Sequence, residues 1–496
     1  MVRLHHLLEN IEIITRQGND DIAVNEIRCD SRRVRQGDVF FALQGTRADG
    51  RRFIAQAMEK GARAVVCQHP FTAPRDIALF TVKDPNAALG IVASNLHASP
   101  SRSLELVGVT GTNGKTTIAT SLFRLFKRQG YKVGLLSTVQ NQIDDEVIPS
   151  THTTPDALQI NQLMRRMVDT GCRYCFMEVS SHALAQRRIA GLRFAGGIFS
   201  NLTQDHLDYH ETFDRYRQAK KSFFDALPSD AFALVNGDDS NSRLMLRDCR
   251  SRKFHYGTRT PVDFHCRILE NQLHGMLLYM NGTEVRTRLT GGFNAANLVA
   301  VYGAAILLGQ PGDSVLTAIG ELGNVAGRFE CIQKSWGITA IIDYAHTPDA
   351  LENVLETIQR IRDRDRTTEK QRIITVVGAG GDRDRTKRPL MGRIVARYSD
   401  KVILTSDNPR SEDPARIIDD IQHGIEGSDR QDTLRIPDRK QAIETALSLA
   451  DPGDIVLVAG KGHETYQESN GIKTPFDDKE VVLAFDPDSH RIPWKP

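Results

Sequence analysis

The sequence lacks most features of secreted, membrane-spanning and nucleic-acid-binding proteins. Its 496 residues contain only seven cysteines, an odd and unpatterned number that favours the reduced thiols of a cytoplasmic protein. No apolar run approaches the ~20 residues of a membrane span, and residues 1–16 have no long apolar core, so we expect no signal peptide. The net charge of +2 supplies no electrostatic footprint for nucleic acid or an acidic membrane.

The chain is long enough for about three domains, and its 40% apolar residues allow sizeable cores. Residues 1–100 indicate a small N-terminal α/β domain. Residues 101–330 alternate strands and helices, which is typical of a mostly parallel central sheet that binds ligands at the carboxyl ends of its strands. Residues 331–496 repeat this alternation. We therefore expect an α/β protein with a central P-loop-type domain and a Rossmann-like C-terminal domain.

One glycine-rich stretch carries the strongest chemical signal. The apolar run 104–110 leads into Gly111-Thr112-Asn113-Gly114-Lys115-Thr116-Thr117, and a helical pattern follows. A strand, a glycine loop and a helix in this order predict a phosphate-binding loop, in which backbone N–H groups face an anion. Lys115 would reach the outer phosphates and Thr116 would ligate Mg²⁺. The strict Walker pattern would place glycine at position 109, where this chain has valine.

Polar residues follow several later strands in both large domains. Glu178 ends one apolar run, and His206 lies in the polar cluster after another. Beside a phosphate loop, these are positions where a metal would be held, with oxygen as the ligand that Mg²⁺ prefers. In the C-terminal region, apolar runs end in the polar segments 378–384, 406–410 and 460–464, which predict a second ligand-binding edge.

Taken together, several separated motifs resemble the Mur ligase family, the ATP-dependent amide-forming enzymes of peptidoglycan precursor synthesis. The resemblance also accounts for Val109, because the family's loop has the form T-G-T-N-G-K-[ST]. It extends in order from about Cys29 to Glu464 and therefore implies three domains. The motifs are GTNGKT at 111–116, EVSSH at 178–182, Asn201 with DHLD at 205–208, GRFE at 327–330 and DYAHTP at 343–348.

Within the family, the chain is most similar to the member that adds diaminopimelate to UDP-N-acetylmuramoyl-L-alanyl-D-glutamate. Asp407-Asn408-Pro409-Arg410 is similar to that member's D-N-P-R motif. The chemistry agrees, because an arginine fork pairs with a distal carboxylate and a glutamate accepts an ammonium. The resemblance implies that the incoming amino acid is held by Arg383, Asp407, Asn408, Pro409, Arg410, Gly460 and Glu464.

The resemblance implies ligand contacts in the other domains as well. The residues implied around ATP are Gly111, Thr112, Asn113, Gly114, Lys115, Thr116, Thr117, Asn294, Asn297, Arg328 and Asp343. The residues implied around the UDP substrate are Cys29, Ser31, Thr46, Arg47, Ala48, His152, Thr153, Thr154, Ser180, Gln186 and Arg188. Of these, His152 stands where the family usually has asparagine.

The implied cofactors are ATP and Mg²⁺, and the implied catalytic residues are Lys115, Glu178, His206 and Lys220. One Mg²⁺ would lie on Thr116 and the phosphates, and a second on Glu178, His206 and Lys220. A lysine ammonium cannot ligate Mg²⁺, but in this family the lysine of Y-x-x-A-K carries CO₂ as a carbamate. Residues 216–220 match that pattern; without the resemblance, Lys220 would be a residue of a solvated helix face.

Three other functions stay open at this point. A lysine-adding sibling is disfavoured by residues 407–410, and folylpolyglutamate synthase by the N-terminal domain. A non-catalytic ATP-binding protein of the same fold is disfavoured by the intact set Lys115, Thr116, Glu178, His206 and Lys220. For the favoured function we expect a cytoplasmic monomer whose partners are the UDP-muramoyl-dipeptide and meso-diaminopimelate, with no nucleic acid and no membrane insertion.

Overall fold

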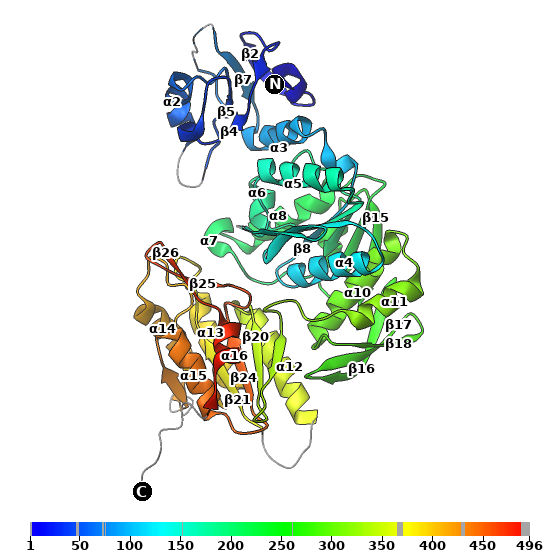
Figure 1. Ribbon diagram of the computed structural model, residues 1–496, viewed down its shortest axis with the longest axis vertical. Coiled ribbons are helices and arrows are strands. Elements are labelled where there is room, and N and C mark those ends of the chain that lie inside the picture. Colours follow the sequence, from blue (N-terminus) through cyan, green and yellow to red (C-terminus); the bar gives the residue numbers. More distant parts are fainter. Residues whose placement is uncertain are drawn as a thin grey trace.

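The computed structural model describes residues 2–45, 49–71, 74, 76–150, 152–259, 261–364, 371–427 and 432–487. Three large sheets follow one another along the chain, with five, eleven and six strands. In Figure 1 they are stacked along the long axis, with the N-terminal sheet at the top and the C-terminal sheet at the bottom. The sheets lie within residues 13–82, 105–287 and 330–459, and the domain limits 1–100, 101–330 and 331–496 stay a prediction.

The N-terminal sheet is small and mixed. Its strands are, in spatial order, β2 (Ile13–Gln17), β7 (Ala78–Val82), β6 (Ala64–Cys67), β5 (Val39–Phe41) and β4 (Ile27–Arg28). β2 pairs antiparallel with β7, and the other pairs are parallel. A short antiparallel pair, β1 (Val2–Arg3) and β3 (Ala23–Val24), lies beside it. The helical segments are α1 (Leu4–Leu7), η1 (Ser31–Arg33), η2 (Gly50–Phe53), α2 (Ile54–Glu59), α3 (Pro85–Leu96) and η3 (Pro100–Arg102).

The central sheet confirms the expected mostly parallel arrangement around the strand that precedes the glycine loop. Its order is β11 (Glu146–Pro149), β10 (Gln140–Ile143), β9 (Val133–Leu136), β12 (Tyr174–Glu178), β8 (Glu105–Thr110), β13 (Gly196–Phe199), β14 (Phe232–Asn236), β15 (Arg252–Gly257), β16 (Phe264–Gln272), β17 (Gly275–Met280) and β18 (Thr283–Thr287). In this spatial order, the neighbouring strands β9, β12, β8, β13, β14, β15 and β16 are parallel. β10 and β11 extend the sheet at one edge and β17 and β18 at the other, all with antiparallel pairing. The parallel strands around β8 are mostly apolar because helices cover both of their faces, and Glu178 at the end of β12 is an exception.

Two apolar cores fill the spaces between the central sheet and its helices. One core lies under α4 (Lys115–Arg128), α10 (Gly292–Leu307) and α11 (Gly312–Glu321). The other lies under α5 (Ala157–Thr170), α6 (Ser181–Ala185), α8 (Phe213–Asp225) and α9 (Ser242–Leu246). The one-turn helix α7 (Leu207–His210) projects towards the C-terminal sheet in Figure 1.

The start of α5 differs from the sequence-based expectation. In the sequence, residues 151–156 predict a helix start with Pro155 near its first position. The helix begins at Ala157 instead, and the Asp156 side chain caps it by accepting from the backbone N–H of Gln159. The aspartate side chain accepts a hydrogen bond from a free N–H group at the helix end, whereas proline only lacks such a group. The aspartate cap therefore determines where the helix begins.

The C-terminal sheet has the order β19 (Glu330–Gln333), β20 (Thr339–Asp343), β24 (Ile455–Ala459), β21 (Ile373–Val377), β22 (Lys401–Leu404) and β23 (Thr433–Arg435). All pairs except β19–β20 are parallel. α12 (Pro348–Arg364), α13 (Lys387–Tyr398) and α14 (Pro414–Gln422) cover one face, and α15 (Arg439–Leu449) and α16 (Asp478–Ala484) the other. The hairpin of β25 (Tyr466–Ser469) and β26 (Ile472–Pro475) stands at the carboxyl edge. Among the described residues, no helix is both long and apolar enough to span a membrane.

Candidate active site

The glycine loop joins β8 to α4 as the sequence predicted. Gly111 has φ +150° and Gly114 has φ +86°, and both lie against neighbours that leave no room for a side chain. A Cβ at Gly111 would lie 1.9 Å from the Ser200 hydroxyl, and one at Gly114 would lie 2.6 Å from Asn297 Oδ1. The loop is therefore held by packing as well as by its own turns, with the start of α4 available to an anion.

Two lysines converge on this loop from different helices. Lys115 Nζ donates to the carbonyl oxygens of Gly111 and Thr112 at 2.9 and 2.8 Å. Lys220 Nζ, from α8, donates to the same Gly111 oxygen at 2.7 Å. Burial lowers the pKa of both lysines, and the charge of Lys115 lowers that of Lys220 further, to well below its usual range. The arrangement therefore favours a neutral amine on Lys220.

Glu178 is a fully buried carboxylate beside the loop. Its Oε2 accepts from the hydroxyls of Thr116 and Thr138, each at 3.1 Å, and its Oε1 accepts from the backbone N–H of Thr138 at 2.8 Å. The contact with Thr116 brings together two residues that the sequence assigned to metal. Both offer oxygen donors, which are the ligands that fit Mg²⁺.

His206 follows β13 and takes a left-handed backbone conformation, with φ +55°. Its Nε2 lies 3.4 Å from a carboxylate oxygen of Asp205, and its ring contacts that of His182 edge-on, with 4.7 Å between centroids. Burial lowers the pKa of His206, which keeps the imidazole neutral and able to ligate a metal. In the described part of the chain, no three His, Cys, Asp or Glu side chains form a preformed metal cluster. A Mg²⁺ here would therefore need oxygen atoms from Thr116 and from bound phosphates as well.

Residues just before β19, at the end of β20 and at the start of α12 lie next to the loop. Arg328 Nη2 donates to the Thr116 hydroxyl at 3.0 Å, and the guanidinium lies over the Tyr344 ring at 4.5 Å. Asp349, in the first turn of α12, accepts from Asn113 Nδ2 at 2.9 Å and from the Thr203 hydroxyl at 3.2 Å. Asp343 ends β20 and is buried, which raises its pKa to about 6. The two large domains thus meet directly across the phosphate loop.

A cavity of about 760 Å³ lies between these domains. All the residues predicted around ATP line it, except Gly111 of the loop itself. Glu178 and His206 line it as well. Lys220 is not among the residues that line the cavity, although its Nζ donates to the Gly111 carbonyl of the loop. In this wall Asn297 Nδ2 donates to Asn294 Oδ1 at 3.1 Å, and Asn294 Nδ2 donates to the Thr290 carbonyl at 2.8 Å.

The residues predicted to hold the UDP substrate fall into two groups. Thr154, Ser180, Gln186 and Arg188 form one network, in which Arg188 donates to the Thr154 carbonyl at 2.6 Å and to Gln186 Oε1 at 2.7 Å. Thr153 adjoins it and accepts from the Thr138 hydroxyl. The remaining predicted residues lie elsewhere: His152 is on the preceding exposed turn, Cys29 and Ser31 are in the N-terminal domain, and Thr46, Arg47 and Ala48 lie outside the described residues.

The residues predicted to hold the amino acid meet at the carboxyl edge of the C-terminal sheet. Asn408 Nδ2 donates to Glu464 Oε2 at 2.7 Å, and Arg410 Nη1 donates to the Gly381 carbonyl at 2.6 Å. A Cβ at Gly460 would lie 2.6 Å from an Asp407 carboxylate oxygen. Pro409 is packed against Gly381, and the exposed Arg383 lies in the adjoining loop.

The family models match three consecutive parts of the chain. The Mur ligase family catalytic domain matches residues 23–106, the middle domain residues 109–305 and the glutamate ligase domain residues 327–462. A relative from Bacteroides fragilis, a UDP-N-acetylmuramoyl-L-alanyl-D-glutamate–2,6-diaminopimelate ligase, is 52% identical over 97% of this chain and 98% of its own. The chain belongs to the Mur ligase family.

Other Mur ligase relatives agree over the full length. A ligase of the same name from Parabacteroides distasonis is also 52% identical, over 97% of this chain and 98% of its own. A solved structure of a ligase of that name has 33% sequence identity and a TM-score of 0.67, with 99% of both chains covered. The fold, with its three α/β units and mostly parallel central sheet, is therefore that of a Mur ligase.

Some residues of this Mur ligase site were not singled out from the sequence. The sequence Thr347-Pro348-Asp349 by itself predicts only a helix cap and first turn, and the contacts of Asp349 with Asn113 and Thr203 carry no local signal. Lys461 is fully buried, and its Nζ donates to Asn408 Oδ1 and Glu464 Oε2, each at 3.1 Å. Its place in the Gly-Lys-Gly-His-Glu segment could have indicated it. Lys387 is buried near Asp205, and burial lowers its pKa.

The first prediction concerns Lys115. Lys115→Ala removes the cation at the loop and should reduce ATP-dependent phosphate release by about 10²–10³-fold, the usual loss for one preorganised electrostatic donor. Phosphate release and circular dichroism together measure activity and fold. Lys127→Ala, which removes a lysine from the last turn of the same helix, is the matched control and should keep its activity. Normal turnover in a folded Lys115→Ala protein would contradict the assignment of this loop to phosphate.

Proposed function

We propose that this Mur ligase joins meso-diaminopimelate to the γ-carboxylate of the D-glutamate in UDP-N-acetylmuramoyl-L-alanyl-D-glutamate, with ATP converted to ADP and phosphate. The observation that carries the proposal is the 52% identity, over 97% of the chain, with a relative that bears this activity in its name. The geometry agrees with it, because Tyr344 lines the cavity beside the phosphate loop and also donates to Glu464 Oε1 at 3.3 Å, at the edge that contains Asn408 and Arg410.

The reaction has to bring two anions together. The substrate carboxylate attacks the γ-phosphorus of ATP, which gives an acyl phosphate and ADP. The amine of diaminopimelate then attacks the acyl carbon, and phosphate leaves from the tetrahedral intermediate. Lys115, which donates to Gly111, and Arg328, which donates to Thr116, supply positive charge where the phosphates would lie. Bound Mg²⁺ would add further charge neutralisation, and Thr116, Glu178 and His206 would hold it.

Lys220 has a separate proposed role as a carbamate. Its lowered pKa favours the neutral amine, which is the form that adds to CO₂; the nitrogen loses a proton and the product carries a negative charge. This converts the buried amine beside Lys115 into an anion with oxygen atoms, which the Lys115 ammonium would attract. The same change would supply the oxygen donor that a metal at Glu178 and His206 needs.

The amino-acid edge suits a substrate with charges at both ends. Glu464 accepts from Asn408, Lys461 and Tyr344, so its carboxylate is oriented and partly neutralised before a substrate ammonium arrives. Arg410 is held at φ +53° by a hydrogen bond from its backbone N–H to the Glu468 carbonyl, at 3.0 Å. The orientation of its guanidinium is therefore restricted, and it would form a two-pronged pair with the distal carboxylate of diaminopimelate.

The direct test is a phosphate-release assay with purified protein. Release should require ATP, the UDP-muramoyl-dipeptide and meso-diaminopimelate together, and should be far slower with lysine as the acceptor. Faster release with lysine would identify the lysine-adding sibling, and release with glutamate and a folate would identify a folylpolyglutamate synthase. No release with any acceptor would indicate a binding protein without catalysis.

A prediction for Arg410 tests the substrate choice. Arg410→Ala leaves the distal carboxylate poorly paired, at a cost of about 2–5 kcal/mol. The KM for diaminopimelate should rise strongly, the KM values for ATP and the UDP substrate should not change, and the preference over lysine should narrow. Arg416→Ala, at an exposed position on α14, is the control. An equal loss for both amino acids would show that Arg410 does not bind the distal carboxylate.

A prediction for Lys220 tests the carbamate. Lys220→Ala should be inactive, and acetate should partly restore turnover by filling the vacated space with a carboxylate. Lys221→Met is the neighbouring control, because Lys221 pairs with Asp225 and Asp248 rather than with the loop; it should stay active and insensitive to acetate. With isotope-labelled bicarbonate, magnetic resonance should detect a carbamate carbon in the unaltered protein and none in Lys220→Ala. An unmodified Lys220 amine in the active enzyme would refute the role.

A further inference from the structure

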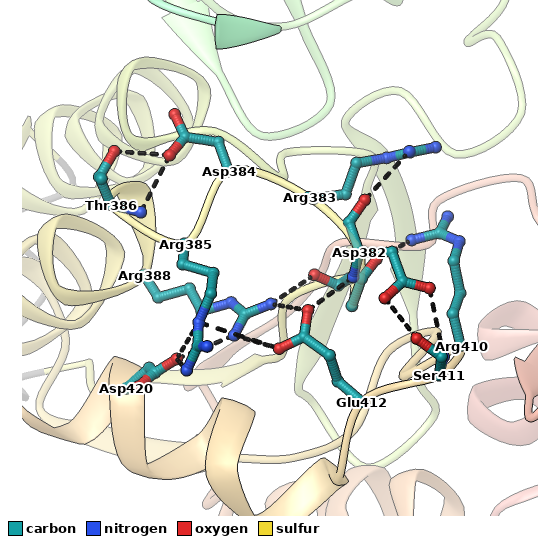
Figure 2. A network of polar contacts seen from close by, with 12 residues as sticks. Asp382, Arg383, Asp384, Arg385, Thr386, Arg388, Arg410, Ser411, Glu412 and Asp420 are labelled. Atoms are coloured by element: carbon teal, nitrogen blue, oxygen red, sulfur yellow. Dashed lines mark hydrogen bonds and ion pairs between the residues drawn. The ribbon is translucent and has the colours of Figure 1, made fainter. Parts of the chain in front are cut away.

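A buried arginine that the proposed reaction does not use joins the two loops at the amino-acid edge. Arg388, on α13, is fully buried and donates to both carboxylate oxygens of Glu412, at 2.8 and 2.9 Å (Figure 2). It also donates to Asp420 at 2.8 Å and to the carbonyl of Gly380 at 3.2 Å. One guanidinium therefore ties the loop after β21 to the segment after β22.

Glu412 continues this connection into the backbone of the first loop. Its Oε1 accepts from the N–H of Asp382 at 2.6 Å, and the Asp382 carboxylate accepts in turn from the Ser411 hydroxyl, also at 2.6 Å. Asp382 and Arg410 both have φ +53°, a left-handed conformation that side chains disfavour. Such conformations persist where the surrounding contacts over-determine them, and this network supplies those contacts.

The two arginines predicted to hold the amino acid both lie beside the tied segment. A Cβ on Gly380 would be 2.9 Å from Arg410 Nη1 and 3.8 Å from Arg383 Cγ. Arg410 Nη1 also donates to the carbonyl of Gly381, whose N–H donates to the Asn408 carbonyl at 2.9 Å. The residue that Arg388 holds through its carbonyl, Gly380, is thus a neighbour of both arginine side chains.

We propose that Arg388 and Glu412 are positioning residues that fix Arg383 and Arg410 relative to each other, and so set the preference for an amino acid with a second, distal carboxylate. This rests on the proposed function. Two neighbouring guanidinium groups repel each other, and without the buried pair beneath them their loops would separate. A fork–carboxylate pair tolerates little displacement, so diaminopimelate would lose binding. Lysine has no distal carboxylate to lose.

Glu412→Gln tests this inference, because it keeps the shape of the side chain and removes its charge. We expect the KM for meso-diaminopimelate to rise about 10- to 100-fold, the scale of loss from a small misplacement. We expect kcat and the KM values for ATP and the UDP substrate to stay within about twofold. The preference for diaminopimelate over lysine, as a ratio of kcat/KM values, should fall by the same factor as the KM rises.

The matched control is Asp454→Asn, at the opposite edge of the same sheet. There Arg372 Nε donates to Asp454 Oδ2 at 2.9 Å, and the Arg372 N–H donates to Oδ1 at 2.7 Å. This variant should lower the melting temperature without changing the KM for diaminopimelate. If Glu412→Gln also weakened ATP and lysine use equally, or left the KM for diaminopimelate unchanged, the positioning role would be refuted.

A milder variant keeps the test decisive if Glu412→Gln does not fold. Ser411→Ala removes only the hydroxyl that bonds Asp382 from an exposed position. It should raise the KM for diaminopimelate by a smaller factor, with kcat and the KM for ATP unchanged; an unchanged KM for diaminopimelate would overturn the inference. Failure of the proposed function is distinguishable, because the unaltered protein would then release no phosphate with diaminopimelate.

Discussion

The Nζ atoms of Lys115 and Lys220 both donate to one carbonyl oxygen, that of Gly111, and the rest of the site depends on this crowding. Two like charges in a low-dielectric environment repel strongly, so the pair of Lys115 and Lys220 is tolerable only if one is neutral or an anion lies nearby. Glu178 and Asp205 are the carboxylates that act on Lys115, and both line the cavity beside the loop. Lys115 and Arg328 add positive charge at the same place, which a polyphosphate would balance.

The C-terminal domain completes the surroundings of that charge. Arg328 and Asp349 reach the loop from another sheet, and both contact side chains of residues 113–116. The cavity is lined by residues at the carboxyl ends of β8, β12 and β20, so the parallel topology of both sheets determines where chemistry can occur. The amino-acid edge at Asn408 and Glu464 is part of the same arrangement.

Most of the fold and the principal parts of the site could be predicted from local sequence. The glycine loop, Glu178, His206 and residues 407–410 each follow an apolar strand, and each lies where that position implies. Contacts between distant segments could not be predicted in this way. Asn113 and Asp349 are 236 residues apart, and Arg388 looks like an exposed helix residue until Glu412 and Asp420 are seen around it. A buried charge is visible only with its partners, and these come from other elements.

The helix cap at Asp156 shows a smaller limit of the same kind. Proline near a helix start is a general preference, whereas the capping hydrogen bond to Gln159 depends on the rotamer of one side chain. Similarly, Lys220 could not be distinguished from Lys221 without the family pattern. Lys220 faces the loop and Lys221 faces two aspartates. This difference arises because successive residues of α8 point in different directions, which the composition does not reveal.

The hydrogen bonds of Asp349 bear on how well the enzyme would protect an acyl phosphate from hydrolysis. In the proposed reaction an acyl phosphate must wait for an amine, and water competes for the same carbon. Asp349 joins α12 to Asn113 of the phosphate loop and to Thr203, which follows β13. The C-terminal domain, which would bind the amino acid, therefore also covers the ATP site. Shielding of a reactive intermediate from hydrolysis is then built into the path of the chain, because the domain that brings the nucleophile also excludes its competitor.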